Sequence, residues 1–326
     1  MTPERLASNP LLRGLVRAAG FRRARWLIQH ALVPLVVTPA RQRRLGALVE
    51  GQLQTFFPHL GGDEAARRAR AYVANYVAKL AEDVITVNVV SVPWMLGCFD
   101  DLVAFEGRAH FGRAVRAGRG VLAVGAHLGS ITFGTAALLS LHLTLAPAER
   151  PLTRLTTEPD VDRAPHVRAA LGAALGGYGA DIALLLTDRP GRDIAHDMAE
   201  TLGAGGLVTT NLDVLRGGGS RKELRLFGGR ARLTLPALVG AAKMALHAGA
   251  TVLPWVNLRQ GEGFRLVVAE PIGPLPRLGA AAEEGHPEVE ALCERLREIL
   301  EGWIAAQPEQ WIYWDRLHKR LVEARP

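Results

Sequence analysis

The sequence predicts an α/β fold in which a mixed sheet is flanked by helices and preceded by a helical segment. From Leu102 onward, short apolar runs alternate with stretches of helical periodicity, which is the pattern of strands covered by helices. The apolar runs 251–258 and 264–271 are separated by a short polar loop, which indicates an antiparallel hairpin. Before residue 100, apolar positions recur every three to four residues instead, which is typical of helices.

The first 99 residues are predicted to form a helical, basic and membrane-associated region. Residues 1–49 contain nine arginines and one acid, Glu4, so their net charge is +8. Because the whole chain has a net charge of +7, residues 50–326 have a net charge of −1. Such a charge favours anionic phospholipid or nucleic acid. Because no nucleic-acid recognition motif accompanies it, we expect an anionic membrane surface as partner and no nucleic acid.

Uncharged stretches in the chain do not predict a membrane span. Residues 26–40 are shorter than the roughly 20 apolar residues that cross a bilayer, and they contain Gln29, His30 and Pro34. The longer stretch 120–148 is interrupted by glycines and His127. We therefore expect a protein that lies on the membrane, with 26–40 either an interfacial anchor or an ordinary buried helix.

Residues 100–326 are predicted to form one α/β domain. The expected strands are 121–126, 181–187, 206–212, 251–258 and 264–271. The expected helices are 130–141, 164–175, 191–203, 236–249 and 286–306.

His127 is the first candidate catalytic residue, because it directly follows a predicted buried strand and opens the turn into a helix. The carboxyl ends of strands are where α/β sheets usually build their sites. A histidine there can act as a general base, or it can be a hydrogen-bonded structural residue.

Several short motifs in order make the chain resemble the bacterial lipid A late acyltransferases of the lysophospholipid acyltransferase superfamily. The resemblance extends from about residue 5 to residue 320. Its elements are Arg119-Gly120, His127, Arg154, Asp213, Phe227-Gly228-Gly229, the strand ending at Pro254, and Pro308-Glu309-Gln310-Trp311.

The resemblance implies a glycerol-phosphate-acyltransferase-like αβα sandwich, and an acyltransferase with His127 as general base. The acyl donor would be a thioester on acyl carrier protein or coenzyme A, used as a co-substrate with no further cofactor. The protein would be peripheral, at the cytoplasmic face of the inner membrane. Substrate-binding residues would be Arg154, Gly129, Ser130, Phe227 and Gly228, with Arg154 either an oxyanion donor or an ordinary surface arginine.

The family motif places an acidic residue five positions after the histidine, where this sequence has Thr132. The carboxylate would orient the imidazole and stabilise its charged form, whereas threonine brings no charge. Asp213, after another strand, is the alternative acid, although it could also pair with Arg221 or cap a helix. Otherwise the acceptor is an amine, as in a specialised-metabolism relative, or the chain is a non-catalytic lipid- or acyl-carrier-binding relative.

Other residue types give little support to metal or thiol chemistry. Cys98 and Cys293 lie outside any CxxC pattern, and the histidines lack metal-ligand spacing. Near the C-terminus, Trp311, Tyr313, Trp314 and Arg316 predict either an interfacial aromatic belt or core packing.

Overall fold

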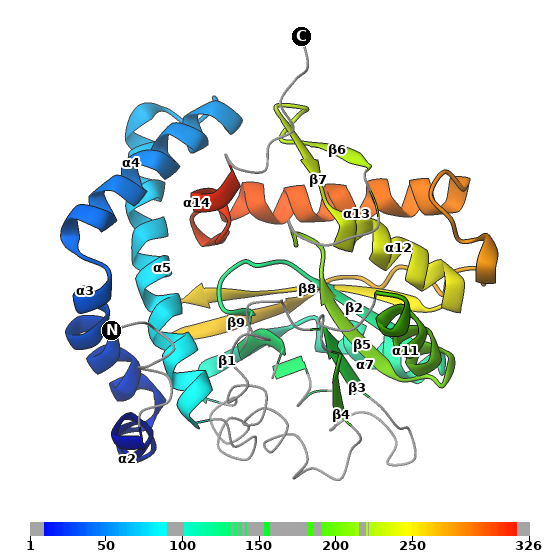
Figure 1. The fold of residues 1–326 in the computed structure, drawn as a ribbon, viewed down its shortest axis with the longest axis horizontal. Coiled ribbons are helices and arrows are strands. Elements are labelled where there is room, and N and C mark those ends of the chain that lie inside the picture. The colour runs from blue at the N-terminus through cyan, green and yellow to red at the C-terminus, as the bar shows by residue number, and fades with distance from the viewer. Residues whose placement is uncertain are drawn as a thin grey trace.

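The computed structural model describes residues 10–89, 101–131, 133–135, 137–138, 141, 153–156, 182–185, 191–214, 220 and 222–317. Within them, a seven-stranded mixed sheet is covered by helices, and helices from the N-terminal part stand against one end of it (Figure 1). The predicted α/β class with a mixed sheet and a helical N-terminal segment is confirmed.

The main sheet has the strand order β1-β9-β8-β2-β5-β3-β4. Strands β8, β2, β5, β3 and β4 run parallel, β9 is antiparallel to β8, and β1 is parallel to β9. Because β2 lies between β8 and β5, the residue that follows β2 lies in the middle of the carboxyl edge. The strands are β1 Val103–Glu106, β2 Val121–Gly125, β3 Thr153–Thr156, β4 Ile182–Leu185, β5 Leu207–Asn211, β8 Thr251–Gln260 and β9 Gly263–Val268.

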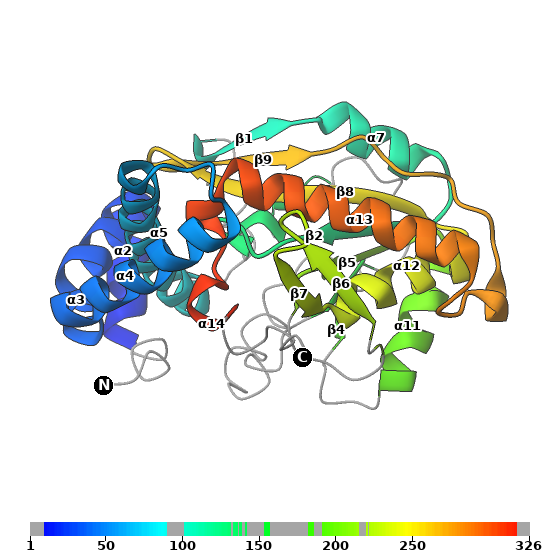
Figure 2. The same ribbon diagram turned by 90° about the horizontal axis from the view of Figure 1, so that it is seen from above.

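The two faces of the sheet carry separate cores, since successive side chains of a strand point to opposite faces. Even-numbered residues of β2 pack in one core with α11 (Gly191–Gly203), α12 (Pro236–Ala248) and α13 (Pro287–Ala306). Odd-numbered residues of β2 pack in the other core with α7 (Arg108–Arg116). All of β2 is buried, and Figure 2, seen from above, shows α13 running across the strands and α7 following β1 at the edge.

A small hairpin of β6 (Glu223–Leu226) and β7 (Ala231–Thr234) lies beside α13. The Arg297 guanidinium of α13 donates to the Arg225 carbonyl (3.3 Å). The sequence did not predict this hairpin, β1 or β3, because each of these strands has four residues, which is too short to establish a periodicity.

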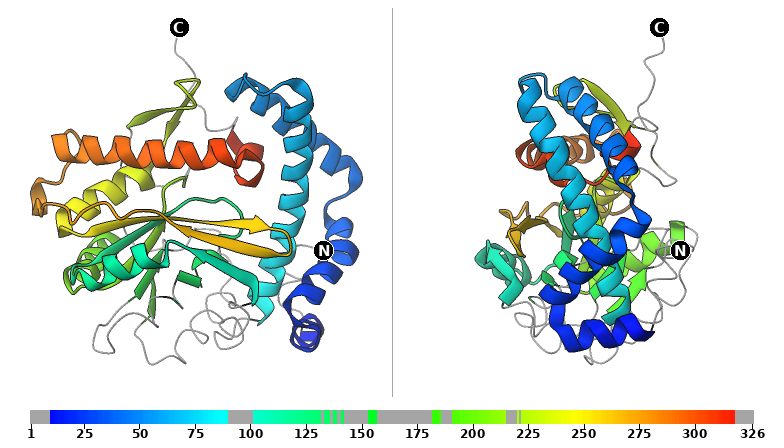
Figure 3. Two further views of the ribbon diagram at one scale, coloured as in Figure 1. Left: turned by 180° about the vertical axis from the view of Figure 1, so that it is seen from behind. Right: turned by 90° about the vertical axis from the view of Figure 1, so that its left-hand side faces the viewer.

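The N-terminal helices form a layer at the end of the sheet where β8 and β9 meet (Figure 3). They are α2 (Pro10–Leu27), the π-helical turn η1 (Ile28–Leu32), α3 (Val33–Val36), α4 (Pro39–Phe56) and α5 (Gly62–Val89). No helix in the described part of the chain combines the length and apolarity needed to cross a bilayer.

This helical layer shares its core with the α/β part. Phe21 of α2 packs edge-on against Phe133 with ring centroids 4.7 Å apart, and Phe133 stacks on Phe264 of β9 at 5.1 Å. Residues Ile28, Val33 and Val37 are also buried, whereas Trp26 and Leu35 are exposed, so 26–40 packs against the core along one side only. Residues 21–37 therefore contribute to the core of the molecule.

The remaining sequence predictions for the fold are confirmed where the structure describes them. The five predicted strands and the β8–β9 hairpin are present, as are the helices expected at 191–203, 236–249 and 286–306. The described residues within 131–141 are helical. The expected helix 164–175 and residues 90–100 lie outside the described residues, and the division into 1–99 and 100–326 stays a prediction.

Candidate active site

His127 lies in a tight turn at the carboxyl end of β2, in the middle of the sheet edge. Its side chain is 4% exposed. The backbone of the turn is held on both sides, since Leu128 N–H donates to the Ala126 carbonyl (2.7 Å) and the His127 carbonyl accepts from Ile312 N–H (3.0 Å). The main chain therefore holds the histidine at this edge.

Asp213 reaches the same point from the neighbouring strand β5. The strands are in register up to Gly125 and Asn211, and Leu212 N–H donates to the Gly125 carbonyl (2.8 Å), which carries the pairing past the strand end. Asp213 Oδ1 lies 2.8 Å from His127 Nδ1, and Oδ2 accepts the His127 backbone N–H, also at 2.8 Å. The sequence-based proposal that Asp213 could reach the histidine is thus matched by direct contact.

The contact defines the state of the imidazole. Asp213 is fully buried, and an ionised carboxylate only accepts hydrogen bonds. An ionised Asp213 accepts from a protonated His127 Nδ1, and in that neutral tautomer Nε2 is the basic nitrogen. This is the arrangement in which a carboxylate orients a histidine for proton transfer and stabilises the imidazolium that forms.

Trp311 adds a third donor to the same carboxylate. It follows η3 (Pro308–Gln310), and its indole Nε1–H donates to Asp213 Oδ2 at 2.8 Å. The neighbouring Tyr313 ring packs edge-on against the His127 ring, with centroids 4.9 Å apart. The sequence marked Trp311 as part of a motif and of the C-terminal aromatic group but not as a partner of Asp213, because a contact 98 residues along the chain leaves no local signal.

The turn after His127 is fixed by a strand that the sequence did not connect with the site. Gly129 has φ 63°, and a Cβ at this position would lie 2.1 Å from the Asn257 carbonyl oxygen of β8. Ser130 N–H donates to that same carbonyl (3.1 Å), and the Asn257 side-chain amide donates to the Ser130 carbonyl (2.7 Å). The available signal was the one amide residue within the buried run 251–258.

The main-chain N–H groups of Gly129 and Ser130 are committed to the fold. Gly129 N–H donates to the Gln310 carbonyl at 3.0 Å, and Ser130 N–H to Asn257 as above. The structure thus gives both residues a role in shaping the turn, and their substrate-binding role stays a prediction.

Arg154 does not share the edge at which His127 lies. It is on β3, whose register places it level with Val208 of β5 and therefore with Leu122 of β2. At about 3.3 Å per residue, this row lies on the order of 16 Å before His127 along the strand direction. The backbone therefore does not bring Arg154 to the carboxyl edge, and its role as an oxyanion donor stays a prediction.

Phe227 and Gly228 form the β6–β7 turn, with positive φ angles of 56° and 64°. Phe227 is buried in an aromatic cluster with Phe56, Phe57, Trp311 and Trp314. Gly228 N–H donates to Glu301 of α13 at 3.0 Å. Among the described contacts, Phe227 meets the site through Trp311, and substrate binding by these two residues stays a prediction.

The sequence left two alternatives open for the aromatic residues near the C-terminus, an interfacial belt and core packing. Trp311, Tyr313 and Trp314 are buried, so the alternative of core packing holds. Aromatic rings beside basic residues occur both at interfaces and in cores, and burial against Phe56 and Phe57 decides between them here.

The remaining candidates from the sequence concern the motif position Thr132, the possible Asp213 partner Arg221, thiol chemistry and metal binding. Thr132, Arg221 and Cys98 lie outside the described residues. Cys293 is buried, and burial raises the pKa of its thiol to about 11, so it is a poor nucleophile at neutral pH. No group of three or more His, Cys, Asp or Glu side chains within the described ranges could hold a metal ion.

Residues 207–321 match the family model described as bacterial lipid A biosynthesis acyltransferase. The matched part contains Asp213, the Phe227–Gly229 turn and Trp311, whereas His127 precedes it. No curated protein sequence matches the chain.

Proposed function

We propose, from the match of residues 207–321 to the bacterial lipid A biosynthesis acyltransferase model, that this chain is an acyltransferase that uses His127 as general base and Asp213 as the acid partner of that base. The observation that carries the proposal is the 2.8 Å contact between His127 Nδ1 and Asp213 Oδ1 at the carboxyl edge of the sheet. It provides the carboxylate that Thr132 cannot provide.

The proposed reaction moves an acyl group from a thioester donor to a hydroxyl or amine acceptor. His127 Nε2 takes the proton of the acceptor as the acceptor oxygen or nitrogen attacks the thioester carbonyl. Asp213 stabilises the resulting imidazolium through Nδ1–H. Collapse of the tetrahedral intermediate breaks the carbon–sulfur bond, and the leaving thiolate takes the proton from His127, so the products are an ester or amide and a free thiol.

The donor is proposed to be acyl carrier protein or acyl coenzyme A, and no cofactor is required because base and carboxylate supply the proton transfers. Because Asp213 supplies the carboxylate, His127 can activate a hydroxyl acceptor as the family motif does. An amine acceptor, as in specialised metabolism, is the alternative that the assay also tests.

Peripheral association with the cytoplasmic face of the inner membrane is supported by the +8 charge of residues 1–49. It is also supported by the exposed side chains of Trp26 (61%) and Leu35 (71%) on the N-terminal helices.

The test is release of free thiol from acyl carrier protein and coenzyme A thioesters of several chain lengths, each with matched alcohol and amine acceptors. His127→Gln should abolish transfer, and Asp213→Asn should lower its rate by roughly 10²–10⁴-fold, as loss of an orienting carboxylate does. His110→Gln is the matched control, because His110 lies on α7 and its Nδ1 contacts the Val268 carbonyl of β9, a strand that β8 separates from β2. Undiminished transfer by His127→Gln would contradict the assignment, and absence of turnover by the wild type with every donor would favour a non-catalytic binding relative.

A further inference from the structure

The segment 307–314 lies between the N-terminal helix α5 and the proposed catalytic pair. On one side it pairs with the catalytic turn, because Leu128 and Trp311 form an antiparallel bridge and Ile312 N–H donates to the His127 carbonyl. The indole of Trp311 then reaches Asp213 at 2.8 Å. A single short segment thus contacts both members of the pair.

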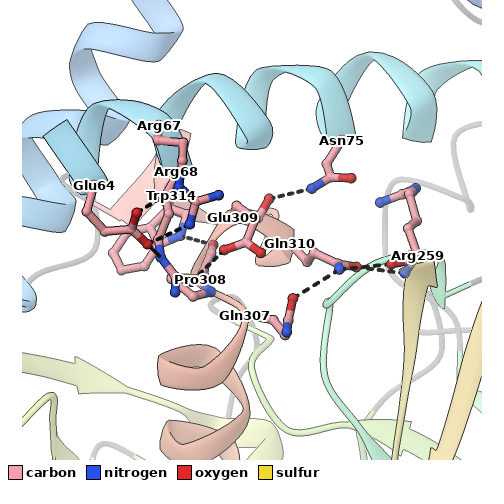
Figure 4. A network of polar contacts seen from close by, with 10 residues as sticks. All are labelled: Glu64, Arg67, Arg68, Asn75, Arg259, Gln307, Pro308, Glu309, Gln310 and Trp314. Atoms are coloured by element: carbon pink, nitrogen blue, oxygen red, sulfur yellow. Dashed lines mark hydrogen bonds and ion pairs between the residues drawn. The ribbon is translucent and has the colours of Figure 1, made fainter. Parts of the chain in front are cut away.

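On its other side the segment is tied to α5 (Figure 4). Arg68 forms an ion pair with Glu309 at 2.8 Å, and the Asn75 amide donates to the Glu309 carbonyl at 3.0 Å. The Tyr72 hydroxyl donates to the Ile312 carbonyl at 3.0 Å. These contacts join helix and segment over sequence separations of more than 230 residues.

A third set of contacts ties the segment to β8. The Gln310 side chain accepts from Arg259 N–H at 2.7 Å and donates to the Arg259 carbonyl at 3.2 Å (Figure 4). Trp314 closes the segment on itself, since its indole N–H donates to the Pro308 carbonyl at 2.6 Å. The position of Trp311 is therefore determined from three directions.

Trp311 matters chemically because Asp213 is fully buried. A buried carboxylate depends on its hydrogen-bond donors, and the donors described here are His127 N–H, His127 Nδ1–H and the indole N–H. The indole is the only one of these three that does not come from His127. It therefore holds the carboxylate in place independently of the histidine that the carboxylate must orient.

We propose that Trp311 is a positioning residue of the acyl transfer, whose indole N–H holds Asp213 against His127, and that residues 307–312, bonded to the catalytic turn, α5 and β8, form the clamp that presents it. The expected change in the kinetics of acyl transfer rests on the proposed function. The contact of the Trp311 indole with Asp213 can be tested without substrate, through the pH midpoint of His127.

Trp311→Phe keeps a buried aromatic ring and removes the donor to Asp213. The carboxylate then has one donor fewer and becomes more basic, so the His127–Asp213 pair takes up its proton at a higher pH. The acid limb of kcat/KM should move upward by at least half a pH unit, and kcat should fall about tenfold, with KM for the donor unchanged. Tyr313 is the other titratable side chain described against the His127 ring, and it is retained in this variant.

Trp314→Phe is the matched control. Trp314 is also fully buried, contacts Trp311 at a centroid distance of 4.9 Å, and loses an indole hydrogen bond in the same way. That bond ends on the Pro308 carbonyl instead of Asp213. A purely structural role for both tryptophans predicts the same outcome for both variants.

The experiment follows the imidazole resonances of histidine-labelled full-length protein as a function of pH, with His127→Gln to assign the signal, alongside the pH profile of thiol release. We expect a raised midpoint for His127 in Trp311→Phe and a wild-type midpoint in Trp314→Phe. Equal midpoints in both variants would overturn the proposal. A raised midpoint in a protein without turnover would keep the clamp and reject the proposed function.

If Trp311→Phe does not fold, incorporation of 3-benzothienylalanine at position 311 replaces the indole N–H by sulfur within the same bicyclic shape. The same upward shift is expected with this residue. A midpoint equal to that of the wild type would overturn the role of the N–H.

Discussion

At the scale of single residues, the contact that defines the site joins two strands. Asp213 meets His127 across 86 residues of sequence, with both side chains buried. The family motif instead places its acid five residues after the histidine, at the position of Thr132. If Asp213 performs this task, restoring the motif should bring no benefit.

Thr132→Glu should leave the rate of thioester turnover unchanged or lower it. The family motif places the acid of this position at the histidine, and a second carboxylate there besides Asp213 would make ionisation of both unfavourable, because like charges in a low-dielectric site repel. The measurement is kcat/KM for wild type and Thr132→Glu with alcohol and amine acceptors, in the wild-type and Asp213→Asn backgrounds. An increase of tenfold or more in the wild-type background would show that Asp213 does not fill the role.

Gly129→Ala should cost far more stability than Gly229→Ala. Both glycines have positive φ, 63° and 83°, so both substitutions carry the left-handed strain of about 1–2 kcal/mol. Only at Gly129 does the new Cβ meet backbone, at 2.1 Å from the Asn257 oxygen, whereas nothing lies within 4 Å at Gly229. Urea unfolding of the two variants measures the difference, and equal losses of stability would contradict the close approach of the turn to β8.

At the scale of elements, the N-terminal helices are joined to the sheet by a buried ion pair. Arg259 of β8 donates to both oxygens of Glu82 on α5, at 3.0 and 2.6 Å, and Arg25 of α2 lies 3.6 Å from the same carboxylate. Glu82 is 1% exposed. Burial lowers the pKa of Arg25, with Glu82 opposing this effect.

Glu82→Gln should lower the free energy of unfolding by about 3–5 kcal/mol, because it leaves a buried guanidinium without its counter-charge. Glu262→Gln is the control, since the Arg22–Glu262 pair spans 3.9 Å between exposed side chains and should be worth less than about 1 kcal/mol. Chemical denaturation of both variants measures the two values. A loss below 1 kcal/mol for Glu82→Gln would mean that the pair does not join the layers.

At the scale of the whole molecule, the basic N-terminal part is both a candidate membrane surface and a part of the core. Phe21, Ile28 and Val37 are buried, while Trp26 and Leu35 are exposed. Deletion of residues 1–49 would therefore uncover the core as well as remove charge. Exposed arginines are the better target for testing membrane association.

Replacing Arg41, Arg43 and Arg44 together by Gln should weaken binding to phosphatidylglycerol vesicles by about 10²-fold, at about 1 kcal/mol per charge. These three side chains are exposed on α4. Co-sedimentation with vesicles at increasing salt measures the effect. The control with equal charge loss replaces Arg225, Arg232 and Arg295, which are exposed on β6, β7 and α13. Binding that does not respond to salt or to the α4 substitutions would indicate insertion through Trp26 and Leu35 instead.

The sequence by itself determined the longer strands and helices and the position of His127 after a strand, because both depend on local residue patterns. The alternation of apolar residues in a buried strand and the three-to-four spacing in a helix depend only on near neighbours, and so does the placement of a histidine after a strand. The short strands β1, β3, β6 and β7 were not predicted, because four residues carry too little periodicity.

Tertiary structure alone decided which side chains meet at the edge. The register of β2 with β5 selects Asp213 as the partner of His127, and the path of residues 307–314 along α5 and β8 delivers Trp311 to that carboxylate. It also decided that the C-terminal aromatic residues are core, since the same residue types would suit a membrane interface. Contacts between residues some 90 positions apart depend on the packing of whole elements, and no local sequence pattern encodes that packing.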